Sequence, residues 1–203
     1  MRLATLSPGL NSWTSLPTFS IIPEISCPGI IGRATRGKKP SCVRISRKQI
    51  AKALGAHVIA KTSSSWKAEK LYSLGADLVV TSENFDKEIK ENTGDGVHLA
   101  FESVGLPTFD RSLRSLRTGG RMVVVGNVDP TPVPLPLGLI ILKGNRIMGS
   151  ISSTREDMKE ALKLSAEGKI SAMVHRKIHL EDVNGAFSEM KSKMSLGRIM
   201  IEL

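Results

Sequence analysis

The sequence predicts an α/β protein with an incomplete doubly wound parallel sheet, preceded by an irregular N-terminal segment. Two observations predict this class. From about Arg47 onward, short apolar runs alternate with charged amphipathic runs, which is the pattern of repeated βαβ units. The first 46 residues show no such alternation and hold many prolines, serines and basic side chains.

The apolar runs are the predicted strands. Most are too apolar to have one face in water, and strands buried on both faces belong to parallel sheets. We expect strands at 57–60, 77–80, 97–101, 121–125 and 145–148, and helices between them at 48–54, 65–74, 85–91 and 108–116. This is the pattern of a Rossmann-like fold, in which ligands bind beyond the carboxyl ends of the strands.

The net charge of the 203-residue chain is +10, and most of it lies near the start. Residues 1–50 hold eight Lys and Arg against one acid, Glu24, so they carry seven of the ten net positive charges. Because no aromatic side chains are interleaved with this basic tract, we expect no specific nucleic-acid partner. Charge alone gives only salt-sensitive, non-specific binding, which makes a nucleic-acid role the weakest alternative.

Two classes of site are not expected. No apolar run approaches the roughly 18 residues that span a bilayer, so we expect no membrane partner and a cytoplasmic location. Cys27 and Cys42 belong to no CxxC motif or Cys/His cluster, so the sequence predicts no zinc site and no other metal site.

The segment after the second predicted strand, Lys61-Thr62-Ser63-Ser64-Ser65-Trp66-Lys67, bears on the choice of cofactor. An NAD-binding protein is expected to place Asp or Glu there to accept hydrogen bonds from the ribose hydroxyls. This segment contains no Asp or Glu close to the end of the strand. Hydroxyls together with Lys61 or Lys67 suit a 2′-phosphate, so we expect NADPH rather than NADH. The alternative role of these serines is to cap the next helix.

Five stretches carry a resemblance to a known family: AKALGAHVIA, LGAD, DGVHLAFESVG, LRTGGRMVVVGNV and IHLEDVNGAFSEMKSKMSLGRIMIEL. From about Gln49 to Leu203 the chain resembles the cofactor domain and C-terminus of the medium-chain dehydrogenase/reductase superfamily, that is, of zinc-type alcohol dehydrogenases and quinone oxidoreductases. The segment LPLGLIILKGNRIMGSISSTREDMKEAL is most similar to archaeal NADPH-dependent acryloyl-CoA reductases. The resemblance implies a Rossmann-like cofactor domain and an NADPH-dependent oxidoreductase.

The resemblance also implies roles for individual residues. Those expected to face the adenosine 2′-phosphate are Ser63, Ser64 and Lys67. Those expected near the ribose and nicotinamide are Ser103, Val104, Gly105, Gly126 and Asn127, with Gly149, Ser150 and Ile151 at the carboxamide. No catalytic residue and no metal ligand is carried over, because the family's zinc ligands lie mostly in a catalytic domain that has no counterpart in this sequence.

The family's glycine-rich turn should fall at about residues 38–44, where this chain has KKPSCVR. In the family these glycines permit a tight turn and bring backbone N–H groups to the pyrophosphate. Here Pro40 has no N–H, and Arg44 stands where the last glycine is expected. Basic side chains binding the phosphates by charge are the less favoured explanation. The favoured one is an interrupted reading frame, from a frameshift, a pseudogene or a gene-model error.

These observations divide the chain into three parts. Residues 1–46 are expected to be irregular and not family sequence. Residues 47–174 form the cofactor-binding domain without a recognisable first strand, and residues 175–203 form a C-terminal segment that in the family packs on the catalytic domain.

Two functional classes then stay open. The chain is either an NADPH-dependent oxidoreductase present as a truncated cofactor-binding portion, inactive alone, or a non-catalytic nucleotide-binding or partner-docking module. Apolar surface uncovered by the missing domain would favour a homo-oligomer. Whether the chain itself is an enzyme is left open.

Overall fold

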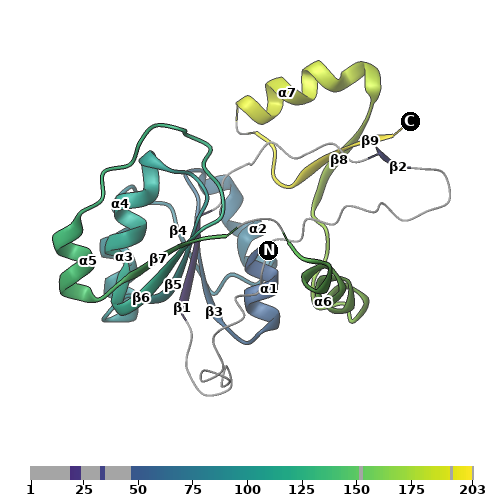
Figure 1. Ribbon diagram of the computed structural model, residues 1–203. Helices are drawn as coiled ribbons and strands as arrows, with labels where there is room; N and C mark the ends of the chain where they lie inside the picture. The colour runs from purple at the N-terminus through teal and green to yellow at the C-terminus, as the bar shows by residue number, and fades with distance from the viewer. Residues whose placement is uncertain (1–18, 24–32, 35–46, 151–152, 193, 203) are drawn as a thin grey trace.

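The main sheet is a doubly wound parallel sheet, as predicted (Figure 1). The computed structural model describes residues 19–23, 33–34, 47–150, 153–192 and 194–202. Six parallel strands follow the order β4-β3-β1-β5-β6-β7. Their bounds are β1 (Phe19–Pro23), β3 (His57–Lys61), β4 (Leu78–Val80), β5 (Val97–Glu102), β6 (Leu116–Val124) and β7 (Arg146–Gly149). The strand order reverses between β1 and β5, which is the point where such sheets bind dinucleotides.

Strand β1 differs from the expectation of an irregular segment over residues 1–46. It lies in the middle of the sheet, where Phe19 is paired with His57 of β3 and Ser20 with Leu99 of β5. The sequence did not reveal it because its five residues, FSIIP, have too short an apolar run to stand out and end on a proline. The expected glycine-rich turn at 38–44 lies outside the described residues.

Helices cover both faces of the sheet (Figure 1). They are α1 (Arg47–Ala53), α2 (Ala68–Ser73) after the short 3-10 helix η1 (Ser65–Lys67), α3 (Phe85–Thr93), α4 (Leu106–Arg114), α5 (Leu137–Lys143) and α6 (Arg155–Ala166). The larger core cluster joins β3, β5 and β6 to α3 and α4, through residues such as Ile59, Phe85 and Leu113. Smaller clusters hold α1 and α2 against the sheet.

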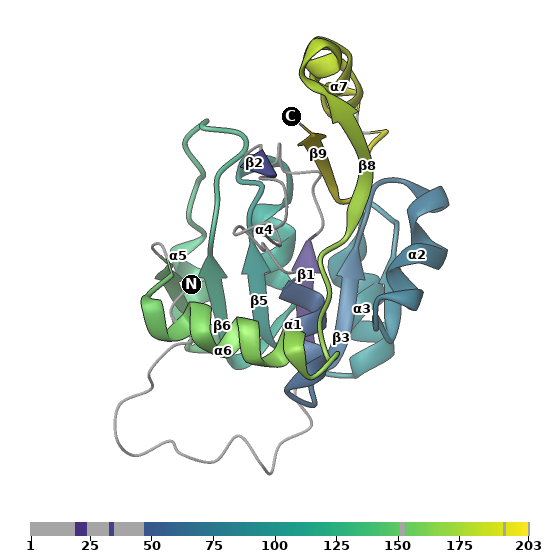
Figure 2. The same ribbon diagram turned by 90° about the vertical axis from the view of Figure 1, so that its right-hand side faces the viewer.

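A second, three-stranded parallel sheet lies beyond the main one (Figure 2). Its order is β2-β9-β8, with β2 (Arg33–Ala34), β8 (Val174–His179) and β9 (Arg198–Glu202). Helix α7 (Val183–Lys191), which follows the 3-10 helix η2 (Leu180–Asp182), packs on it. Lys67 ties this unit to the main domain, because its Nζ donates to the Ser195 carbonyl at 3.1 Å. The domain boundaries at 46 and 174 stay a prediction.

Asp77 joins the starts of β3 and β4. Its Oδ2 accepts from Val58 N–H at 2.8 Å, and its Oδ1 accepts from Lys52 Nζ. Burial alone would raise the pKa of Asp77, but the hydrogen bonds from Lys52 and Val58 outweigh burial, so the pKa lies below its usual 3.8. A carboxylate whose folded pKa is lowered stabilises the fold above its unfolded pKa, and this stability disappears as pH falls through the folded value.

We therefore expect Asp77→Asn to remove a pH-dependent part of the stability. The amide can still accept from Val58 but attracts Lys52 less, so we expect a loss of about 0.5–1 kcal/mol at neutral pH after allowing for solvent screening. Urea unfolding measured between about pH 7 and pH 3 checks this, since the variant and the parent should converge at the acidic end. Asp110→Asn, at an exposed pair with Arg114, is the control. Parallel pH profiles for Asp77→Asn and the parent would refute the assignment.

Candidate functional site

The carboxyl ends of the central strands meet at one edge of the main sheet. Pro23 at the end of β1 is paired with Lys61 at the end of β3, and Ile21 is paired with Ala100, two residues before the end of β5. Glu102 at the end of β5 is in turn paired with Val124 at the end of β6. The segments that follow β3, β5 and β6 therefore all begin at the same edge of the sheet. Those sequence-predicted cofactor residues that the structure describes lie on these segments and at the end of β7, on both sides of the switch point.

A cavity of about 240 Å³ opens beyond β5 and β6. Gly105, Gly126 and Asn127, all predicted cofactor residues, line it together with Glu102, Phe109 and Val124. Its far wall is the loop at 130–133. The cavity thus combines apolar surface, glycine backbone and a few polar groups, which is the usual lining of a small-molecule site.

The loop after β5 forms one wall of the cavity. Ser103, Val104 and Gly105 are buried, and their backbone N–H groups turn inward to one oxygen of Glu102, at 2.9, 2.7 and 3.3 Å. Gly105 has φ +100°, a conformation that residues with side chains rarely adopt. A Cβ on Gly105 would also overlap Asn127 Oδ1 and lie 2.7 Å from the Asp129 carbonyl. Only glycine fits here.

The loop after β6 forms the facing wall. A Cβ at Gly126 would lie 3.3 Å from the Ser103 carbonyl, so the two loops approach closely. They are also hydrogen-bonded, because the Val104 carbonyl accepts from Val128 N–H at 3.0 Å and from Asp129 N–H at 2.9 Å. The structure therefore brings the predicted residues 103–105 and 126–127 together, but of these only Gly105, Gly126 and Asn127 line the cavity surface, because Ser103 and Val104 are buried.

The residues after β7 lie next to this surface. Ser150 N–H donates to the Val124 carbonyl at 2.9 Å, which places Gly149 and Ser150 beside the end of β6. Gly149 is exposed and Ser150 half-buried. Ile151, predicted with them, lies outside the described residues.

The residues predicted for the 2′-phosphate follow β3, two strands away from β5. Ser63 is exposed and Ser64 half-buried, and Ser64 N–H donates to Thr62 Oγ1 at 3.2 Å. Ser64 is the N-cap residue of η1, although its side chain makes no capping hydrogen bond. Both serines are thus placed at the carboxyl edge of the sheet.

The two nearby lysines are engaged by protein groups. Lys67 is buried, with Nζ bonded to the Ser195 carbonyl and 5.0 Å from the centre of the Trp66 ring. Lys61 is also buried and bridges the ends of β3 and β4, donating to the Thr62 and Thr81 carbonyls at 2.9 and 3.1 Å. Burial lowers the pKa of Lys61, and Glu83 and Glu88 partly offset this effect. The sequence did not predict the bonds of Lys61 to Thr81 and of Lys67 to Ser195, because these partners lie 20 and 128 residues away along the chain.

Sequence reasoning missed Glu102 as a member of the site. Glu102 is fully buried at the end of β5 and lines the cavity. The signal that was available is an acid that closes an otherwise mostly apolar strand, VHLAFE, because a buried acid needs several donors around it.

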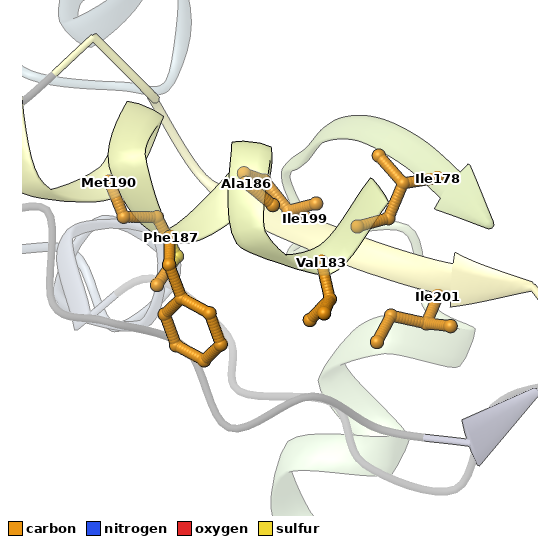
Figure 3. Close-up of a pocket in the computed structure, with 7 residues that line it drawn as sticks. All are labelled: Ile178, Val183, Ala186, Phe187, Met190, Ile199 and Ile201. Carbon is orange, nitrogen blue, oxygen red and sulfur yellow. The ribbon is translucent and has the colours of Figure 1, made fainter. Parts of the chain in front are cut away.

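A second hollow lies between α7 and the second sheet (Figure 3). Its lining is apolar and comes from Val183, Ala186 and Met190 of α7 and Ile178, Ile199 and Ile201 of the strands. Phe187 on α7 also borders it and is 52% exposed. With no polar side chain among these lining residues to orient a ligand, this hollow is a weaker candidate than the cavity beyond β5.

Two further observations concern metals and membranes. Within the described ranges, no group of three or more His, Cys, Asp or Glu is placed to hold a metal ion. Among the same residues, no helix is long and apolar enough to cross a bilayer.

The comparisons with known proteins agree on one family. Residues 48–167 match the family profile described as zinc-binding dehydrogenase. Over 160 residues the chain is 42% identical to acryloyl-coenzyme A reductase of Metallosphaera sedula, a match that covers 78% of this chain and 47% of that protein. An alcohol dehydrogenase of Geobacillus stearothermophilus is 38% identical over 158 residues, 76% of this chain and 46% of that one.

A solved structure shows the same arrangement of elements. Quinone oxidoreductase of Escherichia coli, solved in complex with NADPH, superposes with a TM-score of 0.71 and 26% identity. The match covers 91% of this chain and 57% of that chain. The chain therefore spans about half the length of the relatives it matches.

Proposed function

Because the chain belongs to the zinc-binding dehydrogenase family, we propose that it is the cofactor-binding portion of an NADPH-dependent oxidoreductase of the alcohol dehydrogenase, quinone oxidoreductase and acryloyl-CoA reductase type. The observation that carries the proposal is the cavity beyond β5 and β6, on the β5 side of the switch point of the sheet, lined by Gly105, Gly126 and Asn127. A cytoplasmic location accompanies this proposal.

The residues fit the nicotinamide half of a dinucleotide. At Gly105 and Gly126 a side chain would meet neighbouring backbone or Asn127, so both positions let the main chain itself form the walls. Ser103 and Val104 would lie along the ribose, and Gly149 and Ser150 near the carboxamide. When bound, the cofactor supplies or accepts a hydride, and the protein's part is to hold and orient it.

The adenosine end carries the preference for NADPH. No acid directly follows β3, and the hydroxyls of Ser63 and Ser64 are available at the sheet edge. Lys67 completes the proposed 2′-phosphate site by exchanging its bond to the Ser195 carbonyl for one to the phosphate. Isothermal titration of the full chain with NADPH and NADH tests the proposal. We expect NADPH to bind more tightly, and equal or inverted affinities would refute the preference.

Thr62→Asp should invert this preference. Thr62 follows β3 directly, where a ribose-binding acid is expected, and its Oγ1 accepts from Ser64 N–H, a bond that an Asp carboxylate can also accept. We expect the ratio of NADPH to NADH affinity to fall by about tenfold or more, because the new charge repels the phosphate and accepts from the ribose hydroxyl. Thr62→Asn is the uncharged control, and the same ratio in both variants would contradict the assignment.

We further propose that the 203-residue chain by itself has little or no turnover. Hydride transfer requires a closed, dry site around both nicotinamide and substrate. The proposed cofactor site would supply one side of such an enclosure, and the chain spans about half the length of its relatives. Steady NADPH-dependent reduction of acryloyl-CoA or a quinone by the purified chain would disprove this.

A second candidate function is a partner-docking module that forms a homo-oligomer. The outer side of α5 is its support, since Leu137, Ile141 and Leu142 are 63%, 76% and 86% exposed, and β7 beside it is an edge strand. Exposed apolar side chains of this kind favour association. Light scattering that finds only monomer at high concentration would exclude it.

A further inference from the structure

Glu102 is a buried acid whose hydrogen bonds are all local to the proposed cofactor site. Its side chain is fully buried at the end of β5. Oε1 accepts from the backbone N–H groups of Ser103, Val104 and Gly105, at 2.9, 2.7 and 3.3 Å, and from Thr108 Oγ1 at 2.8 Å. Oε2 accepts from Ser112 Oγ at 2.6 Å.

These five donors are three amides and two hydroxyls, and none of the five is a cation. Burying a carboxyl group is costly unless its oxygens are fully hydrogen-bonded, and an apolar side chain would close the strand without that cost. We therefore interpret the Glu102 carboxyl group as fixing the conformation of the loop that follows it. Three successive amides converging on one oxygen curl residues 103–105 into a nest, and the bonds to Thr108 and Ser112 fix α4 against the same carboxyl group.

The nest determines which groups face the cavity. Because the amides of 103–105 point at Glu102, the Ser103 carbonyl is left to approach Gly126, and the Val104 carbonyl accepts from Val128 and Asp129. Both walls of the cavity thus depend on the loop that Glu102 holds. The carboxyl group also fills the anion-binding concavity that the amides create, so this wall is closed to a phosphate.

We propose that Glu102 is a positioning residue of the cofactor site, which holds residues 103–105 in the conformation that receives the nicotinamide half of the dinucleotide. The inference rests on the proposed function for the identity of the ligand. It depends on the reach of the side chain rather than on charge alone, because Oε1 and Oε2 must meet the loop and α4 at the same time.

Two conservative variants distinguish the effect of the length of the Glu102 side chain from the effect of its charge. Glu102→Gln keeps the length, so its oxygen can still accept from the three amides, and Ser112 can reverse its hydroxyl to accept from the new NH₂ group. Glu102→Asp keeps the charge but is shorter by one carbon–carbon bond, about 1.5 Å, and cannot satisfy both sets of donors. Leu113→Ala, at a fully buried position on the same helix that is not among the partners of the carboxyl group, is the control for general destabilisation.

The affinities of the full chain for NADPH and for adenosine 2′,5′-bisphosphate, which lacks the nicotinamide half, are measured by titration calorimetry. We expect Glu102→Asp to weaken NADPH by about tenfold or more and the bisphosphate by less than about twofold, whereas Glu102→Gln stays within about threefold for both. Leu113→Ala should lower the unfolding temperature without changing the ratio of the two affinities.

Three results would overturn the proposal: an unchanged NADPH affinity in Glu102→Asp, an equal loss of both ligands in that variant, or a loss in Glu102→Gln as large as in Glu102→Asp. If the parent chain binds neither ligand, the proposed function fails. Amide hydrogen exchange then decides on Glu102 alone. Faster exchange of residues 103–105 in Glu102→Asp but not in Glu102→Gln supports positioning, and equal exchange in both overturns it.

Discussion

Gly105→Ala is expected to weaken cofactor binding strongly while the chain still folds. A Cβ at φ +100° and ψ −140° costs on the order of 1–3 kcal/mol in backbone strain. The same Cβ would overlap Asn127 Oδ1 and lie 2.7 Å from the Asp129 carbonyl, so the loop after β6 must move away from the loop after β5. Because these loops form the two walls of the cavity, we expect NADPH affinity to fall by about 100-fold, equivalent to about 2.7 kcal/mol.

Gly94→Ala is a control for strain without the clash. Gly94 has φ +78°, also in the positive range, but a Cβ added there would have no neighbouring atom within 4 Å, and Gly94 follows α3 away from the cavity. The substitution should cost about 1–2 kcal/mol of stability and leave NADPH affinity unchanged. Urea unfolding and titration calorimetry measure the two effects separately. Equal affinities for Gly105→Ala and the parent would mean that the two loops do not form the site.

Phe85→Ala is expected to be the most destabilising change in the core. Phe85 opens α3, is 1% exposed and packs in the cluster that includes Ile59, Val80 and Leu113. Its ring also lies 5.7 Å from Lys61 Nζ, so truncation removes an aromatic partner of a buried ammonium group. Phe→Ala at such a site leaves a cavity and typically costs about 3–5 kcal/mol.

The same substitution at Phe187, which is 52% exposed on α7, is the matched control and should cost less than about 1 kcal/mol. Chemical unfolding of both variants gives the comparison. Similar losses at the two positions would contradict the placement of the core between α3, α4 and the main sheet.

The periodicity of apolar residues predicted those helices and strands whose apolar residues are also the buried ones. Strands β3, β5 and β7 and helices α1, α3 and α4 lie where the alternating runs placed them, within a few residues. The runs in the central strands and helices were informative because helices cover both faces of the main sheet and each such helix buries one stripe. Strand β1 carries no such signal, since its position between β3 and β5 follows from pairing with distant residues.

In the candidate site too, some residues could be predicted from the sequence and others could not. Gly105 and Gly126 could be predicted because small residues at strand ends permit close backbone approach, and the structure places both on the cavity wall. The acid that closes the apolar strand marks Glu102, but the partners of its carboxyl group could not be predicted, because Thr108 and Ser112 reach it only once α4 has packed. The bond of Lys67 to Ser195 likewise depends on how the C-terminal unit folds back.

The most direct test of the central claim is to map the bound cofactor on the chain. Backbone amide shifts of the isotope-labelled protein are followed by NMR during titration with NADPH. The proposed site predicts saturable shifts concentrated at residues 103–105, 126–127 and 63–64, on the two sides of the switch point. Shifts confined to the apolar hollow between α7 and the second sheet, or no saturable shift at the carboxyl edge of the main sheet, would contradict it.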